Sequence, residues 1–114
     1  MNGPYLFTNE DIDQHVPDGT IGAYILSSGN NVASYVGRSD SNLRQRLKQR
    51  ILESRNEGKN YIHFWFQTAD SSLQAYYLEC KWYHEYRPGD NQNHPAIPPG
   101  AAWKCPIPGC PWSV

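Results

Sequence analysis

Two tyrosines lie where they could act together on one substrate. Tyr24 and Tyr35 fall in residues 21–28 and 32–37, two strand-like segments on either side of a Gly29-Asn30-Asn31 turn signal. Because side chains alternate along a strand, both phenols lie on the same face of the predicted hairpin, with β carbons roughly 5 Å apart if the residues pair directly. Such a pair can orient a water molecule or a phosphate, although tyrosines also fill half-buried strand faces without any catalytic role.

The turn between the strands sets their register. A type II′ turn at Gly29-Asn30 would place Tyr24 directly opposite Tyr35. A turn at Asn30-Asn31 would place Tyr24 opposite Gly37 instead. Both registers keep the two tyrosines on one face, so the sequence leaves the register open.

Two helices and a third strand follow the hairpin. Residues 39–41 supply N-cap candidates for a helix that runs to about residue 56, in which Leu or Ile at every fourth position forms the buried stripe. Residues 60–67 alternate as a third strand, and Ser71 with Gln74 makes a capping box for a helix that continues to about residue 86. This order predicts an α/β (α+β) fold with a small three-stranded, mainly antiparallel sheet flanked by helices.

The two ends of the chain differ from this central part. Residues 1–20 are polar, contain two prolines and are expected to form an irregular lead-in. Seven of the nine prolines fall between residues 88 and 111, so residues 92–114 are expected to form a loop-like tail that packs on the domain. With 114 residues the chain has room for one core, which we place in residues 21–91.

Positive charge is concentrated in one segment. The formal net charge of the chain is −1, but residues 38–59 carry seven Lys and Arg against three Asp and Glu, a local net charge of +4. A solvated helix face is the ordinary meaning of such a segment, and a phosphate-contacting face is the functional one. The candidate DNA-binding residues are Arg38, Arg44, Lys48, Arg50 and Arg55.

The expected setting is intracellular and cytoplasmic. No apolar run has the length of a membrane span, so no membrane partner is expected. The first residues lack the basic-then-apolar layout of a signal peptide. Three cysteines, an odd number, argue against a secreted disulfide framework.

Two charged side chains could complete a site with the tyrosines. Arg46 borders the buried stripe of the first helix, so its guanidinium can reach along the sheet, and a guanidinium suits the oxygens of a phosphate. Glu79 lies mid-helix among Tyr76, Tyr83 and Tyr86. A carboxylate among aromatic side chains either accepts hydrogen bonds from their hydroxyls or holds a cation. A surface arginine and a solvated glutamate are the alternatives.

The order of these features along residues 21–91 is distinctive. It comprises Gly22-Ala23-Tyr24, Tyr35-Val36-Gly37, an arginine-bearing helix over residues 42–47, Leu78-Glu79-Cys80 and the segment 86–91, which ends in asparagine. In order and spacing this chain resembles the GIY-YIG nuclease family. That family includes the catalytic domain of phage-intron homing endonucleases and the N-terminal domain of the bacterial excision-repair incision subunit.

The resemblance implies a divalent-metal-dependent DNA endonuclease that hydrolyses phosphodiester bonds with Mg²⁺ or Mn²⁺. Tyr24 is then the expected general base, aided by nearby positive charge because a free tyrosine has a pKa near 10. Tyr35 orients water or phosphate, and Arg46 stabilises charge on the phosphate. Glu79 is the expected metal ligand, and Asn91 braces the site by side-chain hydrogen bonds. A single carboxylate with several waters suits Mg²⁺.

The chain departs from the family pattern at two positions. Ala23 replaces the usual isoleucine, which we expect to affect packing only. Arg50 stands where many members carry histidine, four residues after the arginine, and it can hold a phosphate but cannot shuttle a proton. Gly22 and Gly37 retain the family's glycines and would permit close backbone approach.

The cysteines suggest a second, structural metal site. Cys105 and Cys110 lie in the tail, and Cys80 and His84 share a face of the second helix at i and i+4. Together they could form a Cys₃His zinc site that fastens the tail to the domain. A core role for Cys80 is the alternative.

An alternative to the nuclease is a non-catalytic nucleic-acid-binding or scaffold domain on the same fold. It would account for the basic helix without a metal at Glu79. Either way, DNA is the expected partner. Little of the chain is left for a separate target-reading module, so its intrinsic sequence specificity is expected to be low, or to be supplied by a protein partner or by the tail.

Overall fold

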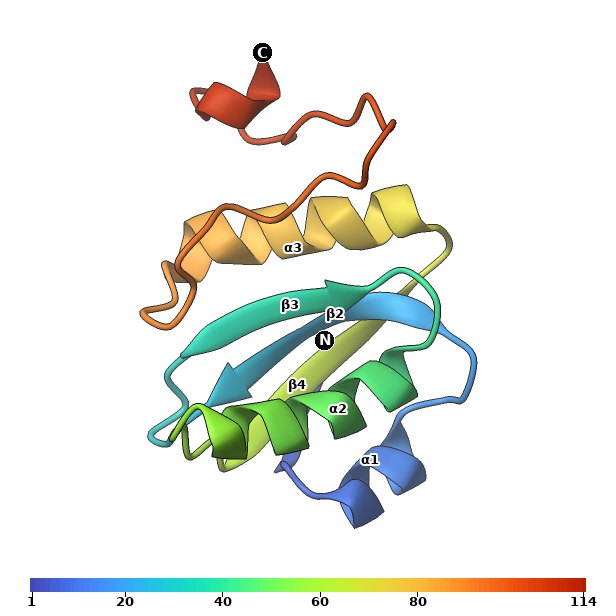
Figure 1. The fold of residues 1–114 in the computed structure, drawn as a ribbon, viewed down its shortest axis with the longest axis vertical. Coiled ribbons are helices and arrows are strands. Elements are labelled where there is room, and N and C mark those ends of the chain that lie inside the picture. The colour runs from blue at the N-terminus through green and yellow to red at the C-terminus, as the bar shows by residue number, and fades with distance from the viewer.

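The structure is a computed structural model that describes residues 1–114, and an antiparallel sheet between helices organises it (Figure 1). In chain order the elements are β1 (Asn2–Leu6), α1 (Asn9–His15), β2 (Ile21–Ser27), β3 (Tyr35–Ser39), α2 (Leu43–Asn56), β4 (His63–Ala69), α3 (Ser72–Tyr86) and a short 3₁₀ helix, η1 (Pro111–Ser113). The four strands pair in the order β1-β4-β2-β3, and every pairing is antiparallel. The predicted α+β class is therefore confirmed, with one strand more than expected.

Helices cover both faces of the sheet. α1 and α2 lie on one face and α3 lies on the other, with the tail beyond α3 (Figure 1). The larger core fills the space under α1 and α2 and includes Ile12, Leu43, Leu47 and Phe64. A smaller one, which contains Trp82, fills the space under α3. None of the helices has the length and apolarity that crossing a membrane requires.

The N-terminal segment is ordered, so the prediction of an irregular lead-in is wrong. β1 pairs with β4 as an edge strand. α1 begins after Thr8, whose hydroxyl accepts a hydrogen bond from the backbone N–H of Asp11. The helix buries Ile12, and Val16, the residue that follows it, is buried as well. Both elements are short and bury few side chains of their own, which is why the sequence pattern does not reveal them.

The hairpin adopts the second of the two predicted registers. Tyr24 pairs with Gly37, and Tyr35 pairs with Leu26, so the direct pairing of the two tyrosines is wrong. Asn30 and Asn31 have φ angles of 56° and 55°, which a type I′ turn requires and asparagine tolerates. β3 begins only at Tyr35, so residues 28–34 form a longer loop than predicted.

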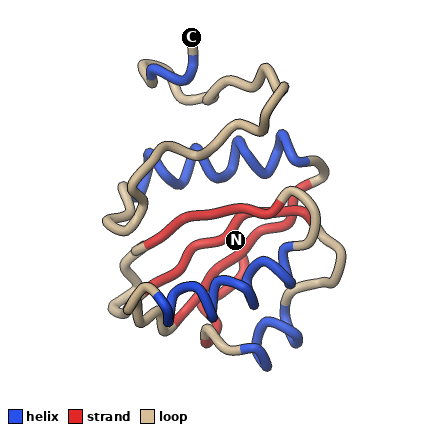
Figure 2. Tube along the Cα trace, viewed as in Figure 1, coloured by secondary structure: helices blue, strands red, loops and turns tan.

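The helix boundaries follow the caps. Asn42 caps α2 by accepting a hydrogen bond from Gln45 N–H, so the N-cap lies one residue beyond the three candidates. Ser71 caps α3 through the N–H of Gln74, as predicted. After α3 the chain runs as loop up to η1 and lies along the outer side of that helix (Figure 2).

Candidate active site

A cleft of about 910 Å³ opens beside β3, the edge strand. β2, β3, α2, α3 and the start of the tail all contribute to its walls. The five residues predicted to be catalytic all line it, namely Tyr24, Tyr35, Arg46, Glu79 and Asn91. The fold thus brings together side chains that lie up to 67 residues apart in the sequence.

Gly37 lets the Tyr24 side chain reach the edge of the sheet. The two residues are cross-strand partners, and the Tyr24 ring lies over the Gly37 backbone. A β carbon at position 37 would overlap the ring and the hydroxyl of Tyr24. Gly22 has a similar role toward β4, since a β carbon there would overlap the carbonyl group of Gln67. The predicted need for close backbone approach at both glycines thus has a concrete cause.

The two tyrosine rings share the α2 side of the sheet. Their centroids are 6.3 Å apart with an interplanar angle of 28°. Tyr24 is almost fully buried, and this burial, together with Tyr35, raises the pKa of Tyr24, whereas Arg46 and Arg50 lower it. Burial likewise raises the pKa of Tyr35 against the opposing effect of Arg50. Without further positive charge, both phenols are therefore neutral at physiological pH.

Two arginines of α2 face the tyrosines. Arg46 donates a 2.8 Å hydrogen bond to Glu53, and Arg50 donates one of 2.7 Å to the other oxygen of the same carboxylate. The Arg50 guanidinium also lies 4.6 Å from the centroid of the Tyr35 ring. Arg50 is the more buried of the two, with 5% of its side chain exposed against 31% for Arg46. Arg46 is thus the more accessible of the two arginines to a ligand in the cleft.

Glu79 reaches the cleft from the opposite layer, and its partner is Arg38. Arg38 Nη1 donates a 2.6 Å hydrogen bond to Glu79 Oε1, and its Nε donates one of 2.9 Å to Asp40. The second oxygen, Glu79 Oε2, makes no hydrogen bond to the protein. Burial raises the pKa of Glu79 to about 7, and the Arg38 guanidinium acts in the opposite direction.

Asn91 is fastened to the edge strand. Its Oδ1 accepts a 2.8 Å hydrogen bond from the Val36 N–H, and its Nδ2 donates one of 2.9 Å to the Val36 carbonyl. This bidentate contact satisfies backbone groups of β3 that have no neighbouring strand on that side. The side chain therefore has the bracing contacts that were expected, and it holds the beginning of the tail against the cleft.

The five candidate DNA-binding residues separate into two groups. Arg38 and Arg50 line the cleft. Arg44 instead donates hydrogen bonds to the carbonyl groups of Val16 and Asp13, and Lys48 forms an ion pair of 2.6 Å with the Asp13 carboxylate. These contacts tie α1 to α2, away from the cleft. Arg55 is exposed near the end of α2 and does not line the cleft either.

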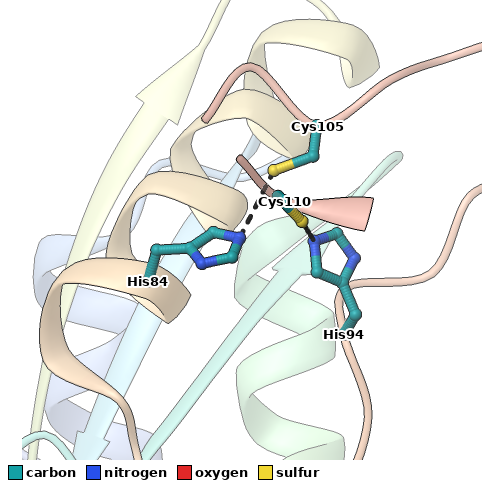
Figure 3. Close-up of side chains that lie close together, drawn as sticks. All are labelled: His84, His94, Cys105 and Cys110. Atoms are coloured by element: carbon teal, nitrogen blue, oxygen red, sulfur yellow. Dashed lines mark hydrogen bonds between the residues drawn. The ribbon is translucent and has the colours of Figure 1, made fainter. Parts of the chain in front are cut away.

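The cysteines and histidines do not gather as predicted. Cys105, Cys110 and His84 lie together, but the fourth member of the group is His94 and not Cys80 (Figure 3). Cys80 is fully buried in the apolar contact between α3 and the tail, beside Tyr76. Burial raises its pKa to about 12. The group that the structure brings together therefore differs from the predicted Cys₃His set at one position, with His94 in place of Cys80.

Comparison with known proteins identifies the architecture. No protein-family model matches the sequence, and no curated protein matches it. A solved structure that is similar is the GIY-YIG N-terminal endonuclease domain of UvrC from Thermotoga maritima bound to its catalytic magnesium, with 22% identity, a TM-score of 0.59, and coverage of 72% of this chain and 97% of that one. A tyrosine-to-phenylalanine mutant of the same domain, bound to its catalytic divalent cation, matches with 21% identity, a TM-score of 0.60, and coverage of 74% and 98%. The protein has a GIY-YIG-like fold. The resemblance predicted from the sequence is therefore confirmed for the fold, and the structural similarity covers most of the chain.

On this GIY-YIG-like fold, one part of the site escaped the sequence analysis. Arg38 was predicted only as a DNA contact, yet it is the direct partner of Glu79 and also stacks on Tyr76 and Trp103. The position of Arg38 directly after Gly37 could have indicated this role. Side chains alternate along a strand, so residue 38 lies with Val36 on the face of the sheet that α3 covers.

Proposed function

We propose that the protein is a divalent-metal-dependent endonuclease that hydrolyses phosphodiester bonds in DNA inside the cell. The observation that carries this proposal is the convergence of the Tyr24 hydroxyl, the Arg46 guanidinium and the Glu79 carboxylate on one open cleft. These three groups come from three different layers of a GIY-YIG-like fold, namely the sheet, α2 and α3. The UvrC domains with this architecture carry their catalytic divalent cation, which supports the same chemistry here.

The donor set of the cleft fits a Mg²⁺ or Mn²⁺ ion. Glu79 is nearly buried and offers one oxygen, Oε2, that no protein group occupies. A cleft of about 910 Å³ with mostly polar walls leaves room for the waters and phosphate oxygens that complete a magnesium coordination shell. When bound, such an ion would polarise the scissile phosphate and stabilise the leaving oxygen.

The tyrosines and arginines supply the remaining functions. The Tyr24 hydroxyl, fixed over Gly37, would hold the attacking water. It can take a proton from that water only as the phenolate, after its own proton has gone to solvent, and this requires added positive charge that offsets the effect of burial on its pKa. Tyr35 orients the water or the phosphate from the neighbouring strand. Arg46 places its guanidinium on the non-bridging oxygens as negative charge accumulates there. Arg50 holds a phosphate oxygen beside Tyr35, where it cannot transfer a proton.

Association with DNA at the cleft should depend on the cation. The charged side chains that line the cleft are four basic ones, Arg38, Arg46, Arg50 and Lys59, and four acidic ones, Asp40, Glu57, Glu79 and Asp90. These charges balance, so the cleft alone offers a polyanion little net attraction. A divalent ion at Glu79 would shift the balance toward positive charge and release Arg38 for a phosphate.

One observation favours the alternative, a non-catalytic nucleic-acid-binding domain. The 2.6 Å contact between Arg38 and Glu79 neutralises the carboxylate without any metal. In such a domain the ion pair would be permanent and structural. A calorimetric titration with Mg²⁺ or Mn²⁺ separates the two, because the nuclease must bind the ion at Glu79 and the pure binder need not.

The activity is tested by incubating the purified protein with plasmid, branched and single-stranded DNA, with and without Mg²⁺. The proposal expects strand cleavage of at least one substrate only when the cation is present. Binding without cleavage of all three, in Mg²⁺ and in Mn²⁺, would favour the non-catalytic domain.

A further inference from the structure

A second group of metal-ligating side chains lies between α3 and the tail. It comprises His84 on α3 and His94, Cys105 and Cys110 in the tail, and their ligand atoms all lie within 4.8 Å of one another (Figure 3). Both cysteines are buried, and both histidines are half-buried. No disulfide is formed.

The spacing within this group matches tetrahedral zinc. Zn–S bonds of ~2.3 Å and Zn–N bonds of ~2.0–2.1 Å place a sulfur and a nitrogen roughly 3.5 Å apart in a tetrahedron. Cys105 Sγ lies 3.4 Å from His84 Nε2, and Cys110 Sγ lies 3.5 Å from His94 Nε2. The widest separation of 4.8 Å exceeds the tetrahedral edge by about an ångström, which side-chain rotations can close.

The surroundings of His94 orient its ring for metal binding. Its Nδ1 lies 3.1 Å from the carbonyl oxygen of Pro95, and a carbonyl can only accept, so Nδ1 carries the proton. The unprotonated Nε2 then faces Cys110 with its lone pair. The ring is also stacked on Trp112 with centroids 5.3 Å apart. A backbone carbonyl on the second ring nitrogen is the usual outer-shell partner of a zinc-bound histidine.

The tail has few other means of holding its fold. After α3 it contains only η1, and its apolar contact with α3 centres on Tyr76, Cys80, Cys105 and Cys110. A structural zinc site supplies folding free energy to such a segment. Two thiolates and two neutral imidazoles around Zn²⁺ also form a neutral group, which suits burial.

We propose that His84, His94, Cys105 and Cys110 bind one structural Zn²⁺ that fastens the tail to α3. Binding replaces the thiol protons of the two cysteines with the ion and releases them to solvent, so the site carries no net charge. Hydrogen bonding between thiols and imidazoles, with no metal, is the competing interpretation.

The site has a consequence for the cleft, and this step rests on the proposed function. Asn91 is fixed to Val36, and His94 is fixed by the zinc, so residues 91–94 are held at both ends. The cleft wall includes residues 91–96. Removal of the zinc should leave this wall anchored at Asn91 alone.

The test is the metal content of reduced full-length protein, purified, incubated with a slight excess of Zn²⁺ and separated from free metal. We expect one zinc per chain, lost in Cys110→Ala and in His94→Ala. Cys80→Ala and His63→Ala are the matched controls, because each removes a cysteine or a histidine outside the group, and both should retain zinc. Replacement by Co²⁺ should produce the visible absorption of a tetrahedral thiolate site.

Two results would overturn the proposal. One is wild-type protein that retains no zinc under these conditions, which decides the question even if a variant fails to fold. The other is zinc that survives His94→Ala and Cys110→Ala but is lost in Cys80→Ala.

Glu79→Gln should keep its full zinc content, so a failure of the nuclease proposal and a failure of the zinc proposal remain distinguishable. Zinc removal should also raise the rate of proteolysis within residues 92–104, a measure independent of DNA cleavage.

Discussion

Substitution of Gly37 by alanine tests whether the Tyr24 hydroxyl acts at the edge of the sheet. The added β carbon would overlap the ring and hydroxyl of Tyr24, whereas ordinary carbon contacts are ~3.5 Å or longer, so the ring must move by about an ångström. A displacement of that size at a reacting group typically costs about a hundredfold in rate. Overpacking of this kind costs about 1–3 kcal/mol of stability, which leaves a folded protein to assay.

The assay is single-turnover cleavage of DNA at saturating Mg²⁺, with folding checked by circular dichroism. Gly89→Ala is the matched control, because a β carbon there has nothing within 4 Å, and it should cleave at the wild-type rate. Tyr24→Phe should itself be slow, and Gly37→Ala should add little in that background, since both act through one hydroxyl. Cleavage by Gly37→Ala at the wild-type rate would refute this reasoning.

Three further predictions concern Arg46, Arg44 and Glu79. Arg46→Ala should lose on the order of a hundredfold in single-turnover rate with a modest loss of DNA affinity; an unchanged saturated rate would make Arg46 a binding residue only. Arg44→Ala should leave that rate unchanged but lower the free energy of unfolding, measured by urea denaturation, by about 1–2 kcal/mol, because it removes hydrogen bonds to the Val16 and Asp13 carbonyls. With the pKa of Glu79 raised to about 7, protons compete with Mg²⁺ for the carboxylate below that pH, so calorimetry should find binding about tenfold weaker at pH 6 than at pH 8. Equal affinity at both pH values would contradict the assigned ligand.

Local sequence patterns predict much of this fold because helix caps, turns and apolar helix faces depend on residues that are close in the sequence. The cap of α3 at Ser71 depends on residues within one turn, and the buried stripe of α2 follows from the spacing of apolar residues within that helix. The asparagine turn after Gly29 allows only a few registers, and one of the two predicted is present. β1 was missed because an edge strand takes its order from β4, nearly sixty residues away, and leaves little periodicity of its own.

The site was predictable in its members but not in its contacts. The functional groups of Tyr24, Arg46 and Glu79 are evident from the residue types alone. Their order along the sequence could therefore be compared with the order in the nuclease family. The pairing of Arg38 with Glu79 depends on how α3 packs against β3, which no local pattern encodes. His94 was missed for a similar reason, because it lies in an irregular tail whose path over α3 is set by tertiary contacts.

The central claim is that Glu79 holds a cation that the reaction requires. Single-turnover cleavage by wild type and by Glu79→Gln, measured across a Mg²⁺ titration, tests it most directly. Glutamine keeps the size and a hydrogen-bond acceptor for Arg38 but removes the charge that holds the ion. We expect cation-dependent cleavage by wild type and none by the variant, with the fold unchanged and the DNA affinity in the absence of metal no lower than that of wild type. Cleavage by Glu79→Gln at the wild-type rate and with the wild-type Mg²⁺ dependence would contradict the account.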